Sequence, residues 1–263
     1  DELDAQRHQL NSFDRLCLDC VQLKRQHRYE EAVPLLREIV ALDPLNPRIT
    51  IGLVQSLTWT NRPREAVAVF LVLSLLAFLL VLLLNSKTIL MSFVAVALAA
   101  SYPFMKRYTH MPQLVLGMAF GWAVPMAFTA LQNQTPPVAW VLFAAAVIWA
   151  LIYDTMYAMV DREDDLKIGI KSTAILFGQH DRALIGIFQL LMLGLLAVAG
   201  VLAGLGVFYW LGLLAGGLMF LYQQWLIRKR EPDSCFRGFL NNNWFGMTIF
   251  CGIAADYYLG AQI

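Results

Sequence analysis

The sequence predicts an all-α membrane protein, in which a bundle of seven transmembrane helices follows a short helical-hairpin segment. Three observations support this fold class. Hydrophobic residues make up 59% of the 263 residues, which is more than ordinary soluble domains contain. Residues 1–66 carry 19 of the 39 Asp, Glu, Lys and Arg residues, whereas the 197 residues that follow carry 20. Long apolar runs begin where the charge density falls.

The charge-rich segment contains an internal repeat. The string RYEEAV at 28–33 recurs as RPREAV at 62–67, so Ala32 and Ala66 are 34 residues apart. This period is typical of tetratricopeptide repeats, whose paired helices approach closely at small residues. The pattern places Leu16, Cys20, Leu23, Leu36 and Ile39 at packing positions.

The repeat and the charge pattern together divide the chain into three parts. We predict a flexible leader over 1–12, a tetratricopeptide-like segment over 13–65 and a membrane domain over 66–263. The repeat segment is either a docking module for a protein partner or a remnant hairpin without one. The second alternative stays open because arrays of this kind need about three repeats to be stable alone.

Seven apolar runs fill the membrane domain. A hydrocarbon core about 30 Å thick requires about 20 residues of helix, and the shorter runs reach that length with the polar residues beside them. Since backbone polar groups in lipid must be satisfied within the protein, the runs predict a helix bundle. In order, the runs are 66–84, 88–104, 114–131, 138–153, 183–205, 207–227 and 244–259.

Loop charge predicts how the bundle is oriented. If residue 65 is cytoplasmic, the loops 105–113, 154–182 and 228–243 lie on the same side, and together they hold ten Lys and Arg residues. The opposite loops hold only Lys87. Positive residues favour the cytoplasmic side, so the N-terminal segment and the charged loops are predicted to lie there.

An acidic cluster follows the fourth apolar run, in YDTMYAMVDREDDLKIGIKST at 153–173. Asp161 and Asp165 are four residues apart, which on one helix brings their Cβ atoms to about 5–6 Å. Asp154 lies seven residues earlier, close to the same face, and Asp164 lies beside the pair. Crowded carboxylates favour a hard cation such as Mg²⁺, which binds one or two carboxylates together with substrate phosphates. The alternative is a solvated charge run at a helix end.

Basic residues accompany the acidic cluster. Lys167 and Lys171 follow it at helical spacing, as phosphate-binding side chains would. The string SYPFMKRYTH at 101–110 presents Tyr102, Lys106 and Arg107 at another helix end on the same side. Carboxylates for a metal and cations for a phosphate at one membrane face point to a diphosphate attached to a lipid. The net charge of +1 does not bear on nucleic-acid binding, but no basic stripe with interleaved aromatic residues is present, so no nucleic-acid partner is predicted.

Three strings resemble one protein family. YPFMKRYTHMPQ, YDTMYAMVDREDDLKIGIKSTAILFG and FLNNNWFG are similar to the UbiA family of intramembrane aromatic prenyltransferases. The resemblance runs from about Glu65 to the C-terminus. It implies a fold of nine transmembrane helices around a central cavity, with two aspartate-rich motifs that bind Mg²⁺ and a diphosphate. The chain would supply seven of those helices.

The resemblance also implies roles for individual residues. Asp161 and Asp165 match the metal ligands of the second motif, and Asp154 and Asp164 lie within its extended form. Tyr102 and Lys106 match a diphosphate-binding pair, which Lys167 and Lys171 would assist. Arg107 matches a residue that holds the carboxylate of the aromatic acid.

The implied substrates are a polyprenyl diphosphate and 4-hydroxybenzoate. By this resemblance, the polyprenyl group would be transferred to the ring in ubiquinone biosynthesis, at a bacterial inner membrane. Another acceptor, such as a naphthoate or haem, remains an alternative.

One feature departs from the family pattern. The first two helices and the first motif, of the type Asn-Asp-x-x-Asp-x-x-x-Asp, should precede the run at 66–84, where this chain carries the repeat segment. Half of the expected metal site is therefore missing from the sequence. We expect either an impaired prenyltransferase or a catalytically inactive fusion that anchors a helical-repeat interaction module to the membrane.

Overall fold

The computed structural model describes residues 16–17, 19–20, 23, 28–42 and 63–259. Over these residues the regular structure is helical throughout, without a strand, which confirms the predicted all-α class. The chain divides into two compact units, Asp1–Leu80 and Val81–Ile263. The predicted leader at 1–12 lies outside the described residues, as does much of the first repeat.

The first unit is built around α3 (Tyr29–Leu42) and α5 (Pro63–Val81). All five predicted packing positions belong to its apolar cluster, in which Ala32 is completely buried. Val69 of α5 packs against this cluster, and Arg37 forms an ion pair with Glu65 at the start of α5. The small residue at position 32 therefore lies where helices pack closely, as the repeat pattern predicts.

Helix α5 combines a polar beginning with a long apolar remainder. Large side chains such as Leu71, Leu75 and Leu80 are 58–67% exposed on it. The apolar part, Val67–Val81, is shorter than a membrane span requires. Helix α5 ends at Val81, before the end of the run predicted at 66–84. A short turn leads to Asn85, which caps the next helix: its side chain accepts a hydrogen bond from the Thr88 N–H at 3.0 Å.

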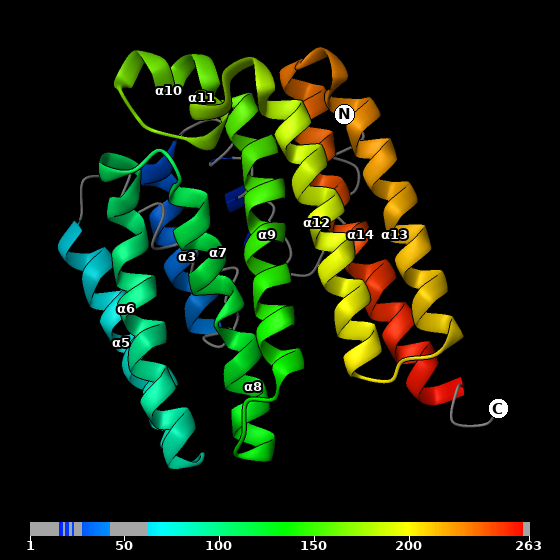
Figure 1. Cartoon of the computed structure of the whole chain (residues 1–263). Helices are drawn as coiled ribbons and strands as arrows, with labels where there is room; N and C mark the ends of the chain where they lie inside the picture. The colour runs from blue at the N-terminus through cyan, green and yellow to red at the C-terminus, as the bar shows by residue number, and fades with distance from the viewer. Residues whose placement is uncertain (1–15, 18, 21–22, 24–27, 43–62, 260–263) are drawn as a thin grey trace. The chain divides into compact units, whose positions relative to one another are not determined.

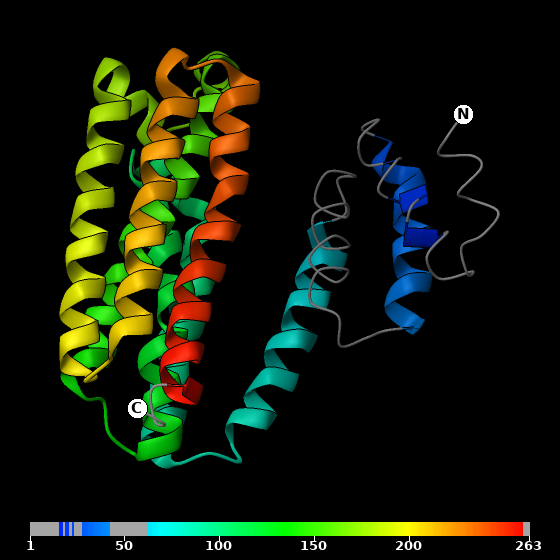
Figure 2. The ribbon, with the colours of Figure 1, turned by 90° about the vertical axis from the view of Figure 1, so that its right-hand side faces the viewer.

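The second unit is a bundle of long helices joined by short turns (Figures 1 and 2). All six apolar runs predicted within it are helical. In chain order its α-helices are α6 (Ser86–Tyr108), α7 (Pro112–Gly121), α8 (Ala123–Gln132), α9 (Pro137–Val160), α10 (Arg162–Ile168), α11 (Thr173–Phe177), α12 (Asp181–Leu202), α13 (Val207–Leu226) and α14 (Pro232–Leu259).

Five segments of the described part are long and apolar enough to cross a membrane, two fewer than the seven predicted. The shortened α5 accounts for one of the two. The other is α14, which contains Asn241, Asn242 and Asn243. The protein is a multi-pass membrane protein. The five segments are Ser86–Met105, Pro112–Gln132, Pro137–Val160, Thr173–Leu202 and Val207–Lys229.

Prolines define several of the helix boundaries. Pro112 and Pro137 occupy the first position of α7 and α9, where a missing N–H costs nothing. The run predicted at 114–131 is interrupted at Trp122, between α7 and α8. Pro125 explains the break, because its ring would clash with the carbonyl oxygen four residues earlier in a continuous helix.

Helix α9 lies in the centre of the bundle, against α7, α8, α12 and α14 (Figure 1). Ala150, Ile152 and Met156 on it are fully buried. Close approach depends on glycine: a Cβ on Gly117 of α7 would lie 2.7 Å from the Val147 carbonyl oxygen of α9. This helix therefore fixes how the neighbouring helices are placed, including the residues at its own C-terminal end.

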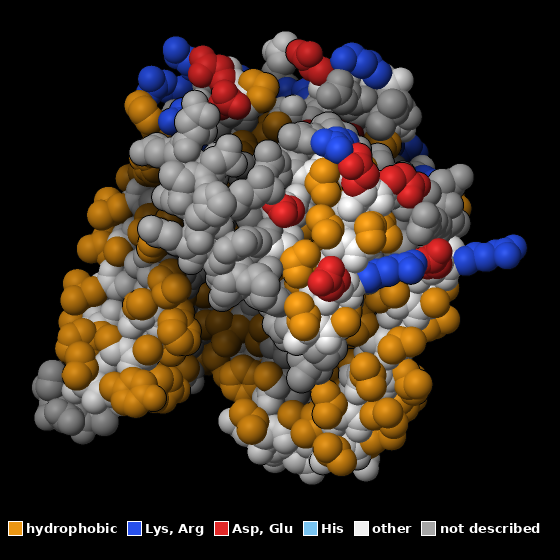
Figure 3. All heavy atoms as spheres, turned by 180° about the vertical axis from the view of Figure 1, so that it is seen from behind, with side chains coloured by type: hydrophobic (Ala, Val, Ile, Leu, Met, Phe, Trp, Pro, Cys, Tyr) orange, Lys and Arg blue, Asp and Glu red, His pale blue; other side chains and the backbone are white. Residues whose placement is uncertain are grey.

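Charged side chains gather at one end of the bundle. The C-terminal ends of α6, α9 and α13 and the N-terminal ends of α12 and α14 meet there. Figure 3 shows Lys, Arg, Asp and Glu side chains at the top, a further group of charged side chains about halfway down, and hydrophobic side chains over the lower flanks. The three loops that sequence analysis assigned to one membrane face thus lie at the same end.

Candidate active site

The acidic stretch forms a short helix at the charged end of the bundle. Helix α9 ends at Val160 and α10 begins at Arg162, with Asp161 between them at φ −92° and ψ 4°. The Asp165 N–H donates to the Asp161 carbonyl oxygen at 2.8 Å, so the two aspartates are one helical turn apart, as predicted. Gly169 ends α10 with a φ of +71°, a conformation that glycine adopts without strain.

The helix break separates Asp154 from this pair. Asp154 belongs to α9, whereas Asp165 belongs to α10, which turns away from the α9 axis in Figure 1. The interpretation of 154–165 as one continuous helical face is therefore wrong. Asp154 instead lies close to two phenols, that of Tyr102 on α6 and that of its chain neighbour Tyr153 on α9.

The basic motif at the end of α6 lies beside the acidic stretch. The Lys171 ammonium group donates to the Tyr108 carbonyl oxygen at 3.4 Å, joining the segment after α10 to the last residue of α6. Arg107 is exposed, and within the described residues no carboxylate pairs with its guanidinium. The side chains of Lys106 and Asp164 lie outside the described part, so their predicted roles stay predictions.

A buried set of hydrogen bonds fixes this arrangement. The Thr155 and Thr173 hydroxyl oxygens are 2.7 Å apart, and the Thr173 N–H donates to the Gln113 side-chain oxygen at 3.3 Å. All three residues are at most 1% exposed. These three residues connect α9, α11 and α7. Helix α9 precedes the acidic stretch, α11 follows it, and α7 follows the basic end of α6. Buried polar groups that are paired in this way specify one arrangement of the chain.

A second buried cluster anchors the start of α10. Asp181, the first residue of α12, is 0% exposed. Arg162 of α10 pairs with it, and Arg230, between α13 and α14, donates to it at 2.9 Å. Beside the cluster, burial raises the pKa of the Cys235 thiol to about 11, and the charge of Asp181 acts in the same direction.

These anchoring residues were not predicted from the sequence. Arg162 and Arg230 entered the prediction only as positive loop charge, and Thr155, Thr173 and Asp181 had no predicted role. The available signal was a polar residue within or beside an apolar run, since such residues need a partner in the membrane. The partners themselves are distant in the sequence and emerge only from the fold.

The carboxylates suit a magnesium ion that is shared with a phosphate. In the part of the chain described here, no group of three or more His, Cys, Asp and Glu side chains could hold a metal by itself. Asp161 and Asp165 offer two carboxylates one turn apart, both partly exposed. Because Mg²⁺ is commonly bound by one or two carboxylates plus substrate phosphates, this donor set fits.

Models of two known protein families match this chain, each over a different range of residues. The model of the UbiA prenyltransferase family matches residues 59–249, which is more than half of the sequence and includes the whole candidate site. The chain belongs to the UbiA prenyltransferase family. A tetratricopeptide repeat model matches residues 23–77, as the 34-residue period predicts. The two matches overlap at 59–77, which includes most of α5.

Two similar proteins of the UbiA family are 4-hydroxybenzoate octaprenyltransferases. The one from Alkalilimnicola ehrlichii is 64% identical over 197 residues, which cover 75% of this chain and 67% of the relative. The one from Methylococcus capsulatus is 60% identical over 194 residues, which cover 74% of this chain and 66% of the relative. The chain therefore spans about two thirds of the length of these relatives.

Solved structures confirm the UbiA fold. The apo structure of a UbiA homologue from Aeropyrum pernix K1 superposes with a TM-score of 0.64 at 24% identity, covering 83% of this chain and 81% of that one. A digeranylgeranylglyceryl phosphate synthase structure superposes with a TM-score of 0.60 at 14% identity, with coverages of 79% and 82%. At these identities the likeness concerns the fold alone.

Proposed function

We propose that this protein transfers a polyprenyl group from a polyprenyl diphosphate to the ring of 4-hydroxybenzoate, a step in ubiquinone biosynthesis. One observation carries the proposal: Lys171 and the buried Thr173–Gln113 pair join the acidic stretch to the basic end of α6 at one end of a membrane bundle. The relatives that are 60–64% identical and named 4-hydroxybenzoate octaprenyltransferases support the choice of substrates.

The acidic stretch is proposed to hold the diphosphate through Mg²⁺. Asp161 and Asp165 would be the metal ligands, with Asp154 and Asp164 completing the acidic surroundings. Bound there, Mg²⁺ supplies Lewis-acid stabilisation of the negative charge on the departing diphosphate. The donor set described above is the support for this assignment.

The basic residues are proposed to bind both substrates. Lys167, Lys171 and Lys106, with the Tyr102 hydroxyl, would hold the diphosphate oxygens and stabilise them as the allylic C–O bond breaks. Arg107 would hold the carboxylate of 4-hydroxybenzoate in a two-point ion pair. The prenyl carbon then bonds to the ring carbon beside the phenol hydroxyl, and that ring carbon loses its proton. The apolar bundle excludes the water that would otherwise capture the prenyl cation.

The site is proposed to face the cytoplasm across a bacterial inner membrane. Ten of the eleven Lys and Arg residues in the loops lie at the end of the bundle that carries the site, and positive loop charge favours the cytoplasmic side. Residues 66–263 would then form the prenyltransferase domain, with the repeat segment at 13–65 on the same side.

A second candidate function follows from the repeat match. A tetratricopeptide model covers residues 23–77, and the string Asn-Asp-x-x-Asp-x-x-x-Asp is absent from the sequence. A membrane-anchored interaction protein without catalysis would need only the fold of the bundle and a partner for the repeat segment.

A radiolabel transfer assay distinguishes the two functions. Membranes containing the full chain would receive labelled polyprenyl diphosphate, 4-hydroxybenzoate and Mg²⁺, and prenylated product would be measured. We expect turnover at least tenfold above that of Asp161→Asn. Asp233→Asn is the matched control, because Asp233 is an exposed aspartate at the same end of the bundle. Equal turnover of wild type and Asp161→Asn would contradict the enzyme proposal and favour the second function.

A further inference from the structure

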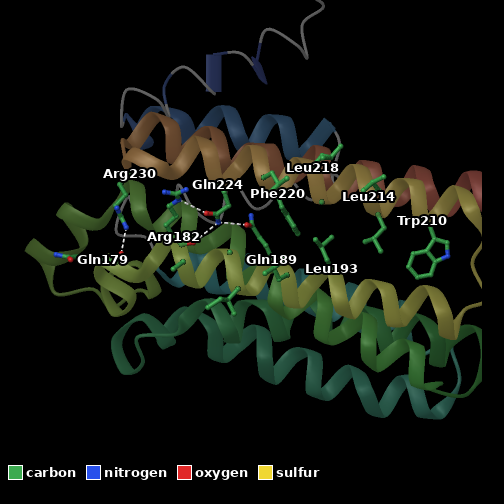
Figure 4. A pocket seen from close by; sticks show the side chains of 17 residues that line it. Gln179, Arg182, Gln189, Leu193, Trp210, Leu214, Leu218, Phe220, Gln224 and Arg230 are labelled. Atoms are coloured by element: carbon green, nitrogen blue, oxygen red, sulfur yellow. Dashed lines mark hydrogen bonds between the residues drawn. The ribbon is translucent and has the colours of Figure 1, made fainter.

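A long groove lies between α12 and α13, separate from the candidate active site (Figure 4). Its volume is about 1060 Å³, and none of the proposed catalytic or substrate-binding residues lines it. The lining positions recur every three or four residues on both helices, from 182 to 193 on α12 and from 210 to 224 on α13. Residues at this spacing lie on one face of a helix, so the groove is lined by one face of α12 and the facing side of α13.

Glycine and the packing of α13 leave this space open. On its other side α13 packs tightly against α14, where a Cβ on Gly212 would lie 3.0 Å from the Gly252 Cα. On the groove side, Gly217 has only the Leu193 side chain near it, 3.7 Å from where a Cβ would lie. Gly212 and Gly217 lie in the same apolar run of the sequence, and the structure places them on different sides of α13.

Most of the groove is apolar and faces outward. Leu190, Leu214 and Leu218 line it and are 60–71% exposed in the structure. At about 1.5 Å per residue, the α13 stripe from 210 to 224 is about 21 Å long. One leaflet of a bilayer core is about 15 Å thick, half of the whole. The groove is therefore long enough to hold an acyl chain of a membrane lipid.

The end of the groove at the charged side of the bundle is cationic. Figure 4 shows Arg182, Gln224 and Arg230 at this end and Trp210 at the other. Arg182 is exposed and donates to the Gln224 side-chain oxygen at 3.3 Å, with no carboxylate partner within the described residues. Arg230 shares the carboxylate of Asp181 with Arg162, so these three side chains carry a net charge of +1.

From the apolar length and the cationic end, we propose that the groove binds a phospholipid with an anionic headgroup. One acyl chain lies along the leucine stripe, and the lipid phosphate binds the Arg182 guanidinium, which Gln224 orients by accepting a hydrogen bond from its Nε–H. Arg230 adds to the positive potential. Basic pockets between transmembrane helices have this kind of selectivity for anionic lipids. The lipid phosphate would also give the Arg182 guanidinium an anionic partner at the depth where the helix ends meet the lipid headgroups.

Native mass spectrometry of the full chain in detergent tests the site. The probes are phosphatidylglycerol and phosphatidylcholine with the same acyl chains. We expect one phosphatidylglycerol to be retained per chain, about fivefold more than phosphatidylcholine, since one arginine at the headgroup contributes about that factor. Arg182→Gln should remove the preference while retaining weak binding of both lipids.

Two glycine variants test the apolar part of the groove. Gly217→Trp fills the groove and should abolish retention of the lipid. Gly194→Trp places the same side chain on α12 at a residue that does not line the groove and has no heavy atom within 4 Å of an added Cβ, and it should retain the lipid. Circular dichroism and size-exclusion chromatography check folding, and if Gly217→Trp is misfolded the Arg182→Gln result decides.

Three outcomes would overturn the proposal. They are equal retention of the two lipids by the wild type, an unchanged preference in Arg182→Gln, and equal retention by the folded Gly217→Trp and Gly194→Trp proteins. Displacement of bound phosphatidylglycerol by a polyprenyl diphosphate would also overturn it, because the groove would then be part of the substrate path.

Discussion

The residues of the candidate site divide into exposed groups that can reach substrate and buried groups that hold them in place. Arg107 is exposed at the end of α6, and Lys171 is tied by one hydrogen bond to the Tyr108 carbonyl oxygen. Asp181, by contrast, is completely buried between two arginines. The two kinds of residue should therefore respond differently to mutation, the first in substrate kinetics and the second in stability.

Two substitutions at the exposed positions should separate the substrates. Lys171→Gln is expected to raise KM for the prenyl diphosphate about 10- to 100-fold and to leave KM for 4-hydroxybenzoate nearly unchanged. Arg107→Gln should do the reverse. Each change removes one charge-assisted hydrogen bond, worth about 1.5–3 kcal/mol. Steady-state kinetics with each substrate varied in turn provides the measurement. Equal effects of both variants on both KM values would show that these assignments are wrong.

The buried Asp181 should act on stability first. Asp181→Asn leaves two guanidinium groups facing a neutral amide and is expected to lower the free energy of unfolding by about 3 kcal/mol. This value is at the low end of the stability loss expected when a buried ion pair is broken, because Arg230 is 37% exposed and partly solvated. Chemical unfolding of the purified chain in detergent measures the loss, with the exposed Asp233→Asn as control. A loss no larger than the control's would mean that the cluster does not anchor α10.

At the scale of the helices, the charged motifs are joined by a few buried polar contacts. The α9–α10 break, the turn after Gly169 and α11 together return the chain to α7, where Thr173 meets Gln113. Thr155 of α9 completes the contact through its hydroxyl. The relative position of the acidic and basic motifs therefore depends on Thr173.

Replacing Thr173 should uncouple activity from stability. In Thr173→Val the hydroxyl contact with Thr155 is lost. The Thr173 N–H can still donate to Gln113, and the Thr155 hydroxyl can still donate to the Leu151 carbonyl oxygen at 2.6 Å. We expect about 1 kcal/mol of lost stability but at least a tenfold lower kcat, because small displacements of catalytic groups are costly. Thr173→Ser keeps the hydroxyl and should restore the rate. The transfer assay and detergent unfolding provide the two readouts, and a Thr173→Val protein with wild-type kcat would contradict this role.

Most of the helices could be predicted from the sequence, because each depends on a local pattern of residues. Apolar length specifies a membrane helix directly, so the runs at 88–104 and 138–153 appear as α6 and α9, extended by polar residues at their ends. The spacing of Asp161 and Asp165 likewise survives as one helical turn. The break at Asp161 did not follow from periodicity, and neither did the ion pair between Arg162, just after the break, and the distant Asp181. Contacts between remote residues leave no local pattern.

At the scale of the whole molecule, the chain combines two sequence relationships that meet within α5. The tetratricopeptide match ends at 77 and the UbiA match begins at 59. Val69 of α5 packs in the first unit, while the helix continues as an apolar segment too short to cross a bilayer alone. About one third of the length of the similar octaprenyltransferases has no counterpart in the matched part of this chain.

Supplying that third in trans should therefore raise the activity. The resemblance to the UbiA family implies that half of the carboxylates around the diphosphate belong to an Asn-Asp-x-x-Asp-x-x-x-Asp motif, and residues 1–263 contain no such string. Loss of one preorganised electrostatic element costs about 10²–10³ in rate. Co-expression with the part of the Alkalilimnicola ehrlichii relative that has no counterpart in this chain is thus expected to increase product in the transfer assay about 100-fold. The same co-expression with Asp161→Asn should give no increase, because the second set of ligands is then disrupted. If the chain alone already matches the rate of the intact relative, its own residues suffice for the site, and the implied need for a second acidic motif is wrong.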